Sequence, residues 1–312
     1  FYLNFMTNNT IPWRCTFTGV DEFSSLEHIE EISLKFPFVE WGVLLSTSEN
    51  RQLNGFRYPS LDWLHTNLPK LSKISQKSGC SIALHVCGKE TKNLLNNIED
   101  NIALQLQPYV QRIQINFRYK PKDISLLESL CYSHPSTIFI TQHNQANIDL
   151  YSKINLPNHQ ILFDTSGGQG IKSSSWPNLL PNKICGYAGG LGLVDIEKDF
   201  SEIFQLANHQ FFWIDMEGKI RTDDKLDLNI CEQILAQINT YDEYEKTIDS
   251  NLKLYDDLIM VNKSSNSAGM TSDFDLEILQ NTKMINEYDL EINDINKKLQ
   301  YSKLYFKTKA DI

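Results

Sequence analysis

The sequence lacks several features that define whole classes of protein. No apolar run approaches the roughly 20 residues that a membrane-spanning helix needs, and no signal-peptide pattern opens the chain. Basic residues are fewer than acidic ones, 29 against 39, which gives a formal net charge of −10 at pH 7. Such a chain is poorly suited to bind nucleic acid or an anionic membrane. We therefore expect neither kind of partner.

Paired cysteines of the kind that bind zinc are also missing. No two cysteines are separated by only two residues, and most lie within apolar runs. This distribution indicates reduced, buried thiols in a cytoplasmic protein, and it argues against a disulfide framework or a zinc site. The cysteines are Cys15, Cys80, Cys87, Cys131, Cys185 and Cys231.

The composition is sufficient for a folded domain. Hydrophobic residues make up 41% and aromatic residues 11% of the 312 residues, which is enough to build a sizeable core. The length fits one large domain with an appendage. We expect an N-terminal extension at 1–14, a main domain at 15–240 and a C-terminal tail at 241–312.

Within the main domain, short runs of branched and aromatic residues alternate with longer stretches of helical spacing. The first kind is typical of strands and the second of helices. The expected strands are 15–20, 39–45, 81–87, 110–117, 137–143, 160–165, 183–188 and 211–216. The expected helices are 24–35, 60–77, 91–104, 123–132, 146–153, 195–207 and 228–238.

This alternation predicts a (β/α)₈ barrel, also called a TIM barrel. About eight strand–helix units in roughly 225 residues is the number and size of such a barrel. A doubly wound open sheet uses fewer strands and places its glycine-rich turn after the first one. Here the glycine-rich turns follow the sixth and seventh strands instead.

The tail differs in character from the main domain. Residues 240–261 and 275–307 carry apolar side chains at helical spacing, and a linker rich in Ser, Asn and Gly joins them at 262–273. Two interpretations stay open. The tail forms helices that pack on the outside of the barrel, or a hairpin through which the chain forms a homo-oligomer or binds a protein partner.

Most of the expected strands begin apolar and finish with a polar residue. In a (β/α)₈ barrel these strand ends meet at one rim, where ligands bind. A sealed apolar core would have to provide each polar group with a buried partner. Their convergence therefore predicts a pocket for a polar ligand, with a water-filled, inactive mouth as the alternative. The residues are Thr18, His85, Gln114, Asn116, Gln142, Asn144, Asp164, Asp215 and Glu217.

Glycine-rich turns indicate that this ligand is an anion. Glycine lets backbone amides approach a ligand closely, and the loops after the last two strands are the usual phosphate site of such barrels. We expect Gly190→Asp to abolish anion binding and to leave the fold intact. The predicted phosphate-binding residues are Gly167, Gly168, Gly170, Gly189, Gly190 and Gly192.

These motifs together resemble the family of phosphoribosylanthranilate isomerase, a (β/α)₈ enzyme of tryptophan synthesis. The likeness extends over about residues 15–238 and leaves the tail unexplained. The sixth-strand stretch resembles the motif of that family, and the seventh resembles its Ala-Gly-Gly-Leu phosphate loop. The matching stretches are 41–45, 57–60, the fourth strand through Gln114, 161–170, 186–191 and 214–215.

The resemblance implies acid–base isomerisation of a phosphorylated, sugar-like metabolite, with Asp164 as general acid and Arg57 holding an anionic substituent. Two departures bear on this. Thr18 occupies the position of the family's catalytic cysteine, and its hydroxyl is too weakly acidic to serve unaided as the base. Glu217 stands where the family has a small turn, and its carboxylate would repel a phosphate unless Lys219 or Arg221 offset it.

The sequence thus predicts a small anionic substrate, with Asp215, Glu217 or His85 as the substitute base. No metal or other cofactor is expected, because the carboxylates and His85 show no recognisable ligand spacing. Each residue alone also fits a structural role. His85 fits a hydrogen-bonded core histidine, and the carboxylates fit ion-paired scaffold groups or, for Asp164, a cap on the following turn.

The substrate is further expected to contact Arg57, Gln114, Asn116, Gln142 and Asn144. Two other functions stay open. The first is a genuine phosphoribosylanthranilate isomerase with a rebuilt base. The second is a catalytically inactive barrel that senses a metabolite or binds a protein through its tail.

Overall fold

The computed structural model describes most of the main domain. The predicted tail at 241–312, with its linker at 262–273, lies outside the described residues, as do residues 1–12 of the predicted N-terminal extension. Contacts within the chain separate a unit that ends at Ile238, close to the expected end of the main domain at 240. The described residues are 13–48, 56–96, 101–164, 170–172, 175–208 and 210–239.

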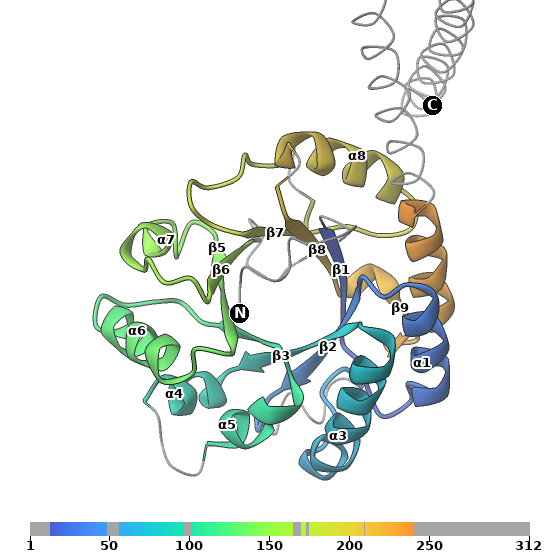
Figure 1. Cartoon of the computed structure of the whole chain (residues 1–312), viewed down its shortest axis with the longest axis horizontal. Coiled ribbons are helices and arrows are strands. Elements are labelled where there is room, and N and C mark those ends of the chain that lie inside the picture. Colours follow the sequence, from blue (N-terminus) through green and yellow to red (C-terminus); the bar gives the residue numbers. More distant parts are fainter. Residues whose placement is uncertain are drawn as a thin grey trace, which may run out of the picture. The chain divides into compact units, whose positions relative to one another are not determined.

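Eight parallel strands close into a barrel in which each strand pairs with the next along the chain, and β8 pairs with β1 (Figure 1). This arrangement confirms the predicted (β/α)₈ fold, and every expected strand is present. The strands are β1 (Trp13–Thr18), β2 (Val39–Leu45), β3 (Ser81–Cys87), β4 (Arg112–Asn116), β5 (Ile138–His143), β6 (His159–Phe163), β7 (Cys185–Ala188) and β8 (Phe212–Met216).

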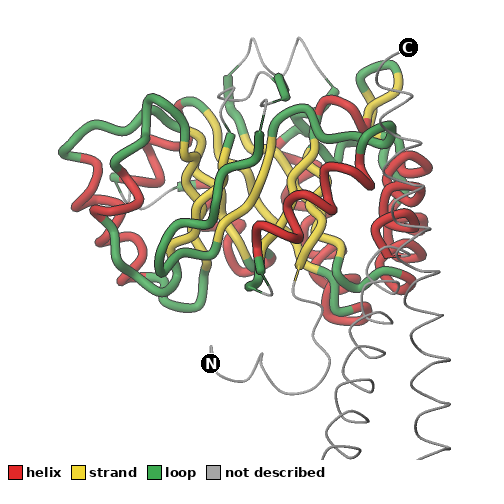
Figure 2. Tube along the Cα trace, turned by 90° about the horizontal axis from the view of Figure 1, so that it is seen from above, coloured by secondary structure: helices red, strands yellow, loops and turns green. Residues whose placement is uncertain are grey.

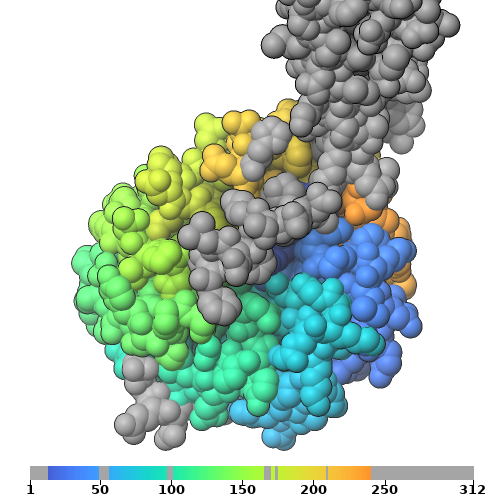
Figure 3. Space-filling model, in the orientation of Figure 1, coloured from blue at the N-terminus to red at the C-terminus, as the bar shows by residue number. Residues whose placement is uncertain are grey.

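Helices surround the strands as an outer layer (Figure 2). In the space-filling view the segments follow one another around the barrel in chain order (Figure 3). Residues 228–239 are also helical, and a small hairpin of β9 (Arg221–Thr222) and β10 (Lys225–Leu226) follows β8. The other helices are α1 (Leu26–Lys35), α3 (Leu61–Ser78), α4 (Lys89–Leu95), α5 (Ile102–Leu106), η2 (Gln107–Tyr109), α6 (Asp123–Ser133), α7 (Leu150–Lys153), α8 (Ile196–Ala207) and η3 (Gly218–Ile220).

Two expected helices differ from the prediction, and asparagine side chains mark both differences. The stretch 91–104 is not one helix, because α4 ends at Leu95 and α5 begins anew behind Asn101, whose side chain caps it by accepting from the Leu104 amide at 3.1 Å. The stretch 146–153 is helical only in α7. Here the Asn144 side chain accepts from the Ala146 amide at 3.0 Å, a local turn that competes with helix.

The inside of the barrel is apolar on the side of β5 to β8. Ile140, Leu162 and Trp213 pack together there as a buried cluster. Gly186 on β7 makes room for the indole ring, because a Cβ atom at this position would overlap Trp213. A glycine in a strand ordinarily weakens it, and here close packing requires it.

The other side of the interior is charged. Arg112 of β4 and Glu40 of β2 form an ion pair at 3.2 Å, and Thr16 donates to Glu40 at 2.9 Å. The Arg112 guanidinium also lies over the Trp213 ring, 4.1 Å from its centre. β2, β4 and β8 are not neighbours in the barrel, so these side chains meet inside it. Arg112, Glu40 and Trp213 are each at most 1% exposed.

The six cysteines are free and buried, as the sequence predicts for thiols within apolar runs. Within the part of the chain that the structure describes, no helix combines the length and the apolar character needed to cross a membrane.

Candidate functional site

A cavity of about 1120 Å³ lies at the carboxyl ends of the strands, where the sequence predicts a pocket. Thr18 and Gly192 do not line it directly, and Gly167 and Gly168 lie outside the described residues. The predicted residues that line it are Arg57, His85, Gln114, Asn116, Gln142, Asn144, Asp164, Gly170, Gly189, Gly190, Asp215 and Glu217.

Three residues of the predicted site meet where β8, β1 and β3 end. The Thr18 hydroxyl donates to Asp215 Oδ1 at 2.7 Å and lies 3.5 Å from His85 Nε2. All three side chains are buried. Gly42 on β2 lies between them, and a Cβ atom there would approach the Thr18 hydroxyl to 2.7 Å. The glycine in β2 therefore allows Thr18 and His85 to approach each other across the intervening strand.

Burial displaces the pKa values of both ionisable members of this cluster. It raises the pKa of Asp215 to about 8, with a further increase from Glu217 and Glu40, against the hydrogen bond from Thr18 that lowers it. Burial lowers the pKa of His85 to about 3, and the positive charge of Arg112 beneath it acts in the same direction. At neutral pH His85 is therefore neutral, and Asp215 mostly retains its proton.

Asp164, which directly follows β6, faces the same cavity. The Gln142 amide of β5 donates to Asp164 Oδ2 at 3.0 Å. The two carboxyl groups of Asp164 and Asp215 are thus both buried, each held by a neutral hydrogen-bond donor from an adjacent strand. This arrangement is suited to proton transfer, which is one of the roles that the sequence predicts for these carboxyl groups.

The predicted amide residues of β4 form a connected row. The Gln114 amide donates to Asn116 Oδ1 at 3.0 Å, and Asn116 lies 3.3 Å from Cys87 Sγ on β3. Both amides line the cavity. They offer a ligand neutral donors and acceptors and no charge.

Glycines of two loops form one wall of the cavity. Gly170, Gly189 and Gly190 adopt positive φ angles of 67°, 108° and 71°. A Cβ atom on Gly190 would lie 2.8 Å from the backbone of Lys172, so a side chain there would strain the loop. Gly190→Asp is therefore expected to disturb the local structure, which corrects the expectation of an intact fold.

Lys219, which the sequence suggested only as an offset for Glu217, lines the same wall after β8. Its side chain packs against Gly192, where a Cβ atom would approach Lys219 Cβ to 2.7 Å. Gly192 thus brings the loops after β7 and β8 together, although it does not face the cavity itself. A primary ammonium group beside glycine-rich backbone is suited to bind an anion.

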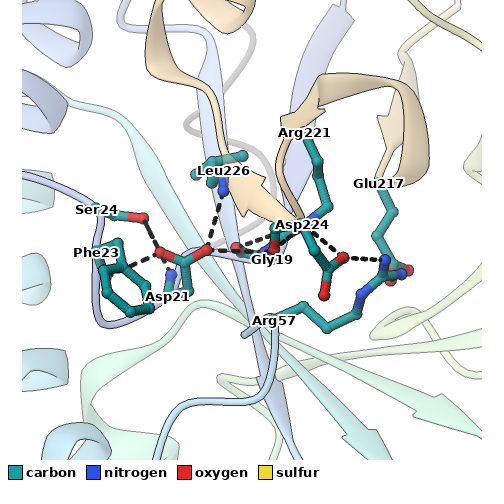
Figure 4. Close-up of polar contacts among 9 residues, drawn as sticks. All are labelled: Gly19, Asp21, Phe23, Ser24, Arg57, Glu217, Arg221, Asp224 and Leu226. Atoms are coloured by element: carbon teal, nitrogen blue, oxygen red, sulfur yellow. Dashed lines mark hydrogen bonds and ion pairs between the residues drawn. The ribbon is translucent and has the colours of Figure 1, made fainter. Parts of the chain in front are cut away.

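Arg57 is held by carboxylates. Its guanidinium donates to Glu217 at 2.8 Å and to Asp224 at 2.6 Å (Figure 4). These carboxylates raise the pKa of Arg57, although burial opposes them. The charge of Glu217 is therefore offset by Arg57, and not by Lys219 or Arg221 as the sequence suggested.

Arg221 instead links the hairpin after β8 to the loop after β1. It donates to the buried carboxylate of Asp21 at 2.8 Å and to the Gly19 carbonyl at 2.9 Å (Figure 4). Asp21 also accepts from the amides of Phe23 and Leu226 at 3.0 and 2.9 Å. Arg221 and Asp21 thus build the rim and do not face the cavity.

Sequence reasoning missed one cavity residue with a visible signal. Arg118 lines the cavity two residues beyond β4. It continues the period-two series Arg112, Gln114 and Asn116, whose side chains point into the barrel. Its position in a loop hid the signal, since strand alternation is normally read only within a strand.

Among the described residues, no group of three or more His, Cys, Asp or Glu side chains is placed to hold a metal ion. We assign no residue of the site to a metal or cofactor.

The fold and the cavity define a (β/α)₈-barrel protein with a polar pocket that contains buried carboxyl groups. No protein-family model and no curated protein matches the sequence.

Solved structures that are similar to this chain include three enzymes of low identity. Thiamine phosphate pyrophosphorylase from Pyrococcus furiosus is 8% identical, with a TM-score of 0.43 over 73% of this chain and 96% of that one. 3-Deoxy-D-arabino-heptulosonate 7-phosphate synthase from Thermotoga maritima is 10% identical, with a TM-score of 0.44 over 74% of this chain and 87% of that one. D-psicose 3-epimerase from Clostridium cellulolyticum H10 is 10% identical, with a TM-score of 0.39 over 74% of this chain and 98% of that one. The barrel assignment rests on the strand order of this chain itself.

Proposed function

We propose that the chain binds a phosphorylated, sugar-like metabolite in the cavity and catalyses a proton transfer on it, as an isomerase does. The observation that carries this proposal is the pair of buried carboxyl groups, Asp164 and Asp215, that face one cavity. An isomerisation requires one group that gives a proton and another that takes one. The pair supplies two such groups, from strands β6 and β8, which are separated by β7.

Asp215 is the best of the three candidate bases. Glu217 is engaged by Arg57, and the pKa of His85 near 3 makes its neutral ring a weak base. The pKa of Asp215 near 8 leaves only a minor ionised fraction at neutral pH, but this fraction is a stronger base than an ordinary carboxylate. Asp164 keeps the role of general acid that the sequence suggested.

The phosphate of the metabolite would bind to Gly189, Gly190 and Lys219. Gly189 and Gly190 line the cavity with positive φ angles, and Lys219 adds a positive charge to the same wall. This location after β7 and β8 is also the usual phosphate position of such barrels.

The relation to phosphoribosylanthranilate isomerase is part of the proposal, with one modification. Thr18 occupies the position of that family's base, and its hydroxyl donates to Asp215. We infer that Thr18 acts through Asp215 and accepts no proton from the substrate itself. Authentic activity of that enzyme is therefore expected to be absent or very weak, and rescue of a tryptophan auxotroph that lacks it would contradict this expectation.

A catalytically inactive, metabolite-binding barrel is the second candidate. The observation that favours it is Thr18 itself, because the first strand carries no group that can take a proton at neutral pH. Both candidates predict phosphate binding, and only the first predicts exchange of a substrate proton.

The experiment that separates them measures hydrogen exchange. The protein is incubated in D₂O with ribulose 5-phosphate and with fructose 6-phosphate, and deuterium at the carbon next to the carbonyl is followed by NMR. We expect exchange with the parent protein, a loss of roughly 10²-fold or more in Asp215→Asn, and no change in the exposed control Asp62→Asn.

Binding of both sugar phosphates is measured in parallel by thermal shift. Binding without exchange would overturn the catalytic role and leave the inactive barrel. Failure of both sugar phosphates and of inorganic phosphate to bind would overturn the whole proposal.

A further inference from the structure

Arg118 differs from the other arginine of the cavity in its surroundings. Arg57 is shared between two carboxylates, whereas Arg118 forms no ion pair with another described residue. The Arg118 side chain is exposed and lines the cavity. The charge of Arg57 is therefore neutralised by carboxylates of the protein, whereas no ion pair with a described residue neutralises the charge of Arg118.

The backbone on both sides of Arg118 is fixed by one buried side chain. Asn147 donates to the Phe117 carbonyl at 2.9 Å and accepts from the Tyr119 amide at 3.0 Å. The same amide group of Asn147 donates to the Gln142 carbonyl at 3.2 Å, which ties this loop to the end of β5. Asn147 is 1% exposed. The loop therefore presents Arg118 from a fixed position, which lowers the entropy lost when a ligand binds.

The surroundings of Arg118 on the cavity wall are neutral and polar. Asn116 ends β4, and Asn144 and Gln145 follow the neighbouring strand β5, whereas the carboxylates of the cavity lie directly after β6, within β8 and just after β8. Arg118 therefore lies on a part of the wall that has donors for an anion and no described carboxylate that competes for it.

Arg118 and Lys219 lie on opposite sides of the barrel mouth. Arg118 follows β4 and Lys219 follows β8, and these strands are four apart in a closed ring of eight. Strands spaced ~4.8 Å apart and tilted about 36° give a barrel roughly 15 Å wide between opposite backbones. Two long cationic side chains that extend inward from both sides leave room for a small metabolite between them.

We propose that the metabolite carries a second anionic group, a carboxylate or a phosphate, at the end opposite its phosphate, and that Arg118 binds this group. The proposal rests on the proposed function, because it takes Lys219 and the glycine loop as the phosphate end. It moves the second anion from Arg57, where the sequence placed it, to the other side of the cavity. The reacting carbons of such a ligand would then lie between the two ends, beside Asp164 and Asp215.

The test compares singly and doubly anionic probes by calorimetry. Glucose 6-phosphate is paired with 6-phosphogluconate, which adds a carboxylate, and fructose 6-phosphate with fructose 1,6-bisphosphate, which adds a phosphate. We expect the doubly anionic member of at least one pair to bind at least tenfold more tightly to the parent protein. The pair that shows the difference identifies the second group.

Variants assign this difference to Arg118. Arg118→Gln should reduce the tenfold difference to less than threefold and leave the monophosphates unchanged, whereas Lys219→Met should weaken all four probes. Lys122→Gln, an exposed position in the same loop, serves as the control and should change nothing.

Equal affinity within both pairs, or an unchanged difference in Arg118→Gln, would overturn the second subsite and leave the proposed function standing if the monophosphates bind. Failure of all four probes to bind would overturn both.

Discussion

The charged side chains around the barrel mouth form two groups that differ in whether the protein neutralises them. In the first group, which we term the rim network, Arg57 and Arg221 bind the carboxylates of Asp21, Glu217 and Asp224 (Figure 4). These ion pairs join the segments after β1, β2 and β8. Their charges are used to hold loops in place.

The second group consists of ionisable side chains that line the cavity, as Arg57 and Glu217 also do, but that form no ion pair with another described residue. Arg118 and Lys219 form no ion pair with another described residue, and Asp215 accepts a hydrogen bond from Thr18 but pairs with no cation. Burial raises the pKa of Asp215, and the hydrogen bond from Thr18 offsets this only in part. The comparison shows that formal charge in a sequence does not distinguish a structural residue from a ligand-binding one. The presence of an ion-pair partner in the structure does distinguish them.

The largest effect is expected from the rim network. Arg221→Met leaves the fully buried carboxylate of Asp21 without its cation, and loss of one partner of a buried pair costs about 3–5 kcal/mol. The free energy of unfolding, measured by urea titration, should fall by that amount. Arg118→Met is the matched control and should change it by less than about 0.5 kcal/mol. Equal losses in the two variants would remove the distinction between the groups.

The next effect concerns the pH dependence of stability. The folded-state pKa of Asp215, about 8, lies above its ordinary value of 3.8, so the folded protein binds this proton more tightly than the unfolded chain. Between about pH 4 and pH 8 stability should therefore decrease as pH rises, by up to about 1.4 kcal/mol per pH unit from this group.

Asp215→Asn tests this expectation because the amide cannot ionise. The variant should gain stability relative to the parent as pH rises from 5 to 8, and thermal unfolding at both pH values measures the gain. Glu217→Gln, at an ion-paired position, should show no such gain. A constant difference between Asp215→Asn and the parent would contradict the raised pKa.

A smaller effect is expected at Thr18. Thr18→Val keeps the shape but removes the hydroxyl that stabilises the ionised form of Asp215, so the pKa of Asp215 should rise by about one further unit. If Asp215 is the base, kcat/KM in the exchange reaction rises with pH through about 8 in the parent and about one unit later in the variant. A profile that falls through the same pH would identify Asp215 as the acid.

The smallest effect is expected at Lys219. Lys219→Met removes one exposed cation from the cavity wall and should weaken inorganic phosphate binding three- to tenfold, about 1 kcal/mol. The unfolding free energy should stay unchanged, since Lys219 has no described ion-pair partner. This variant replaces Gly190→Asp as the test of the phosphate site, because the latter would strain the loop against Lys172. Unchanged phosphate binding would remove Lys219 from the site.

The fold was predictable because its signals are local. Each strand is a short and mainly apolar run, and β2 and β3 are buried along their whole length, as in strands covered on both faces. The two helix predictions that were wrong, at 91–104 and 146–153, also have local causes. Asparagine side chains at Asn101 and Asn144 competed with helix through turns and caps, where apolar spacing gives no warning.

The sequence by itself determined that polar groups from successive strands converge on one mouth, because strand order and side-chain alternation require it. Only the tertiary structure decided which of those groups are neutralised. Arg57 meets Glu217 across 160 positions of sequence, and Arg221 meets Asp21 across 200. Thr18 reaches Asp215 across 197 positions, while burial raises the pKa of that carboxyl. Ion pairing and desolvation depend on neighbours in space, and closing the barrel brings those neighbours from opposite ends of the main domain.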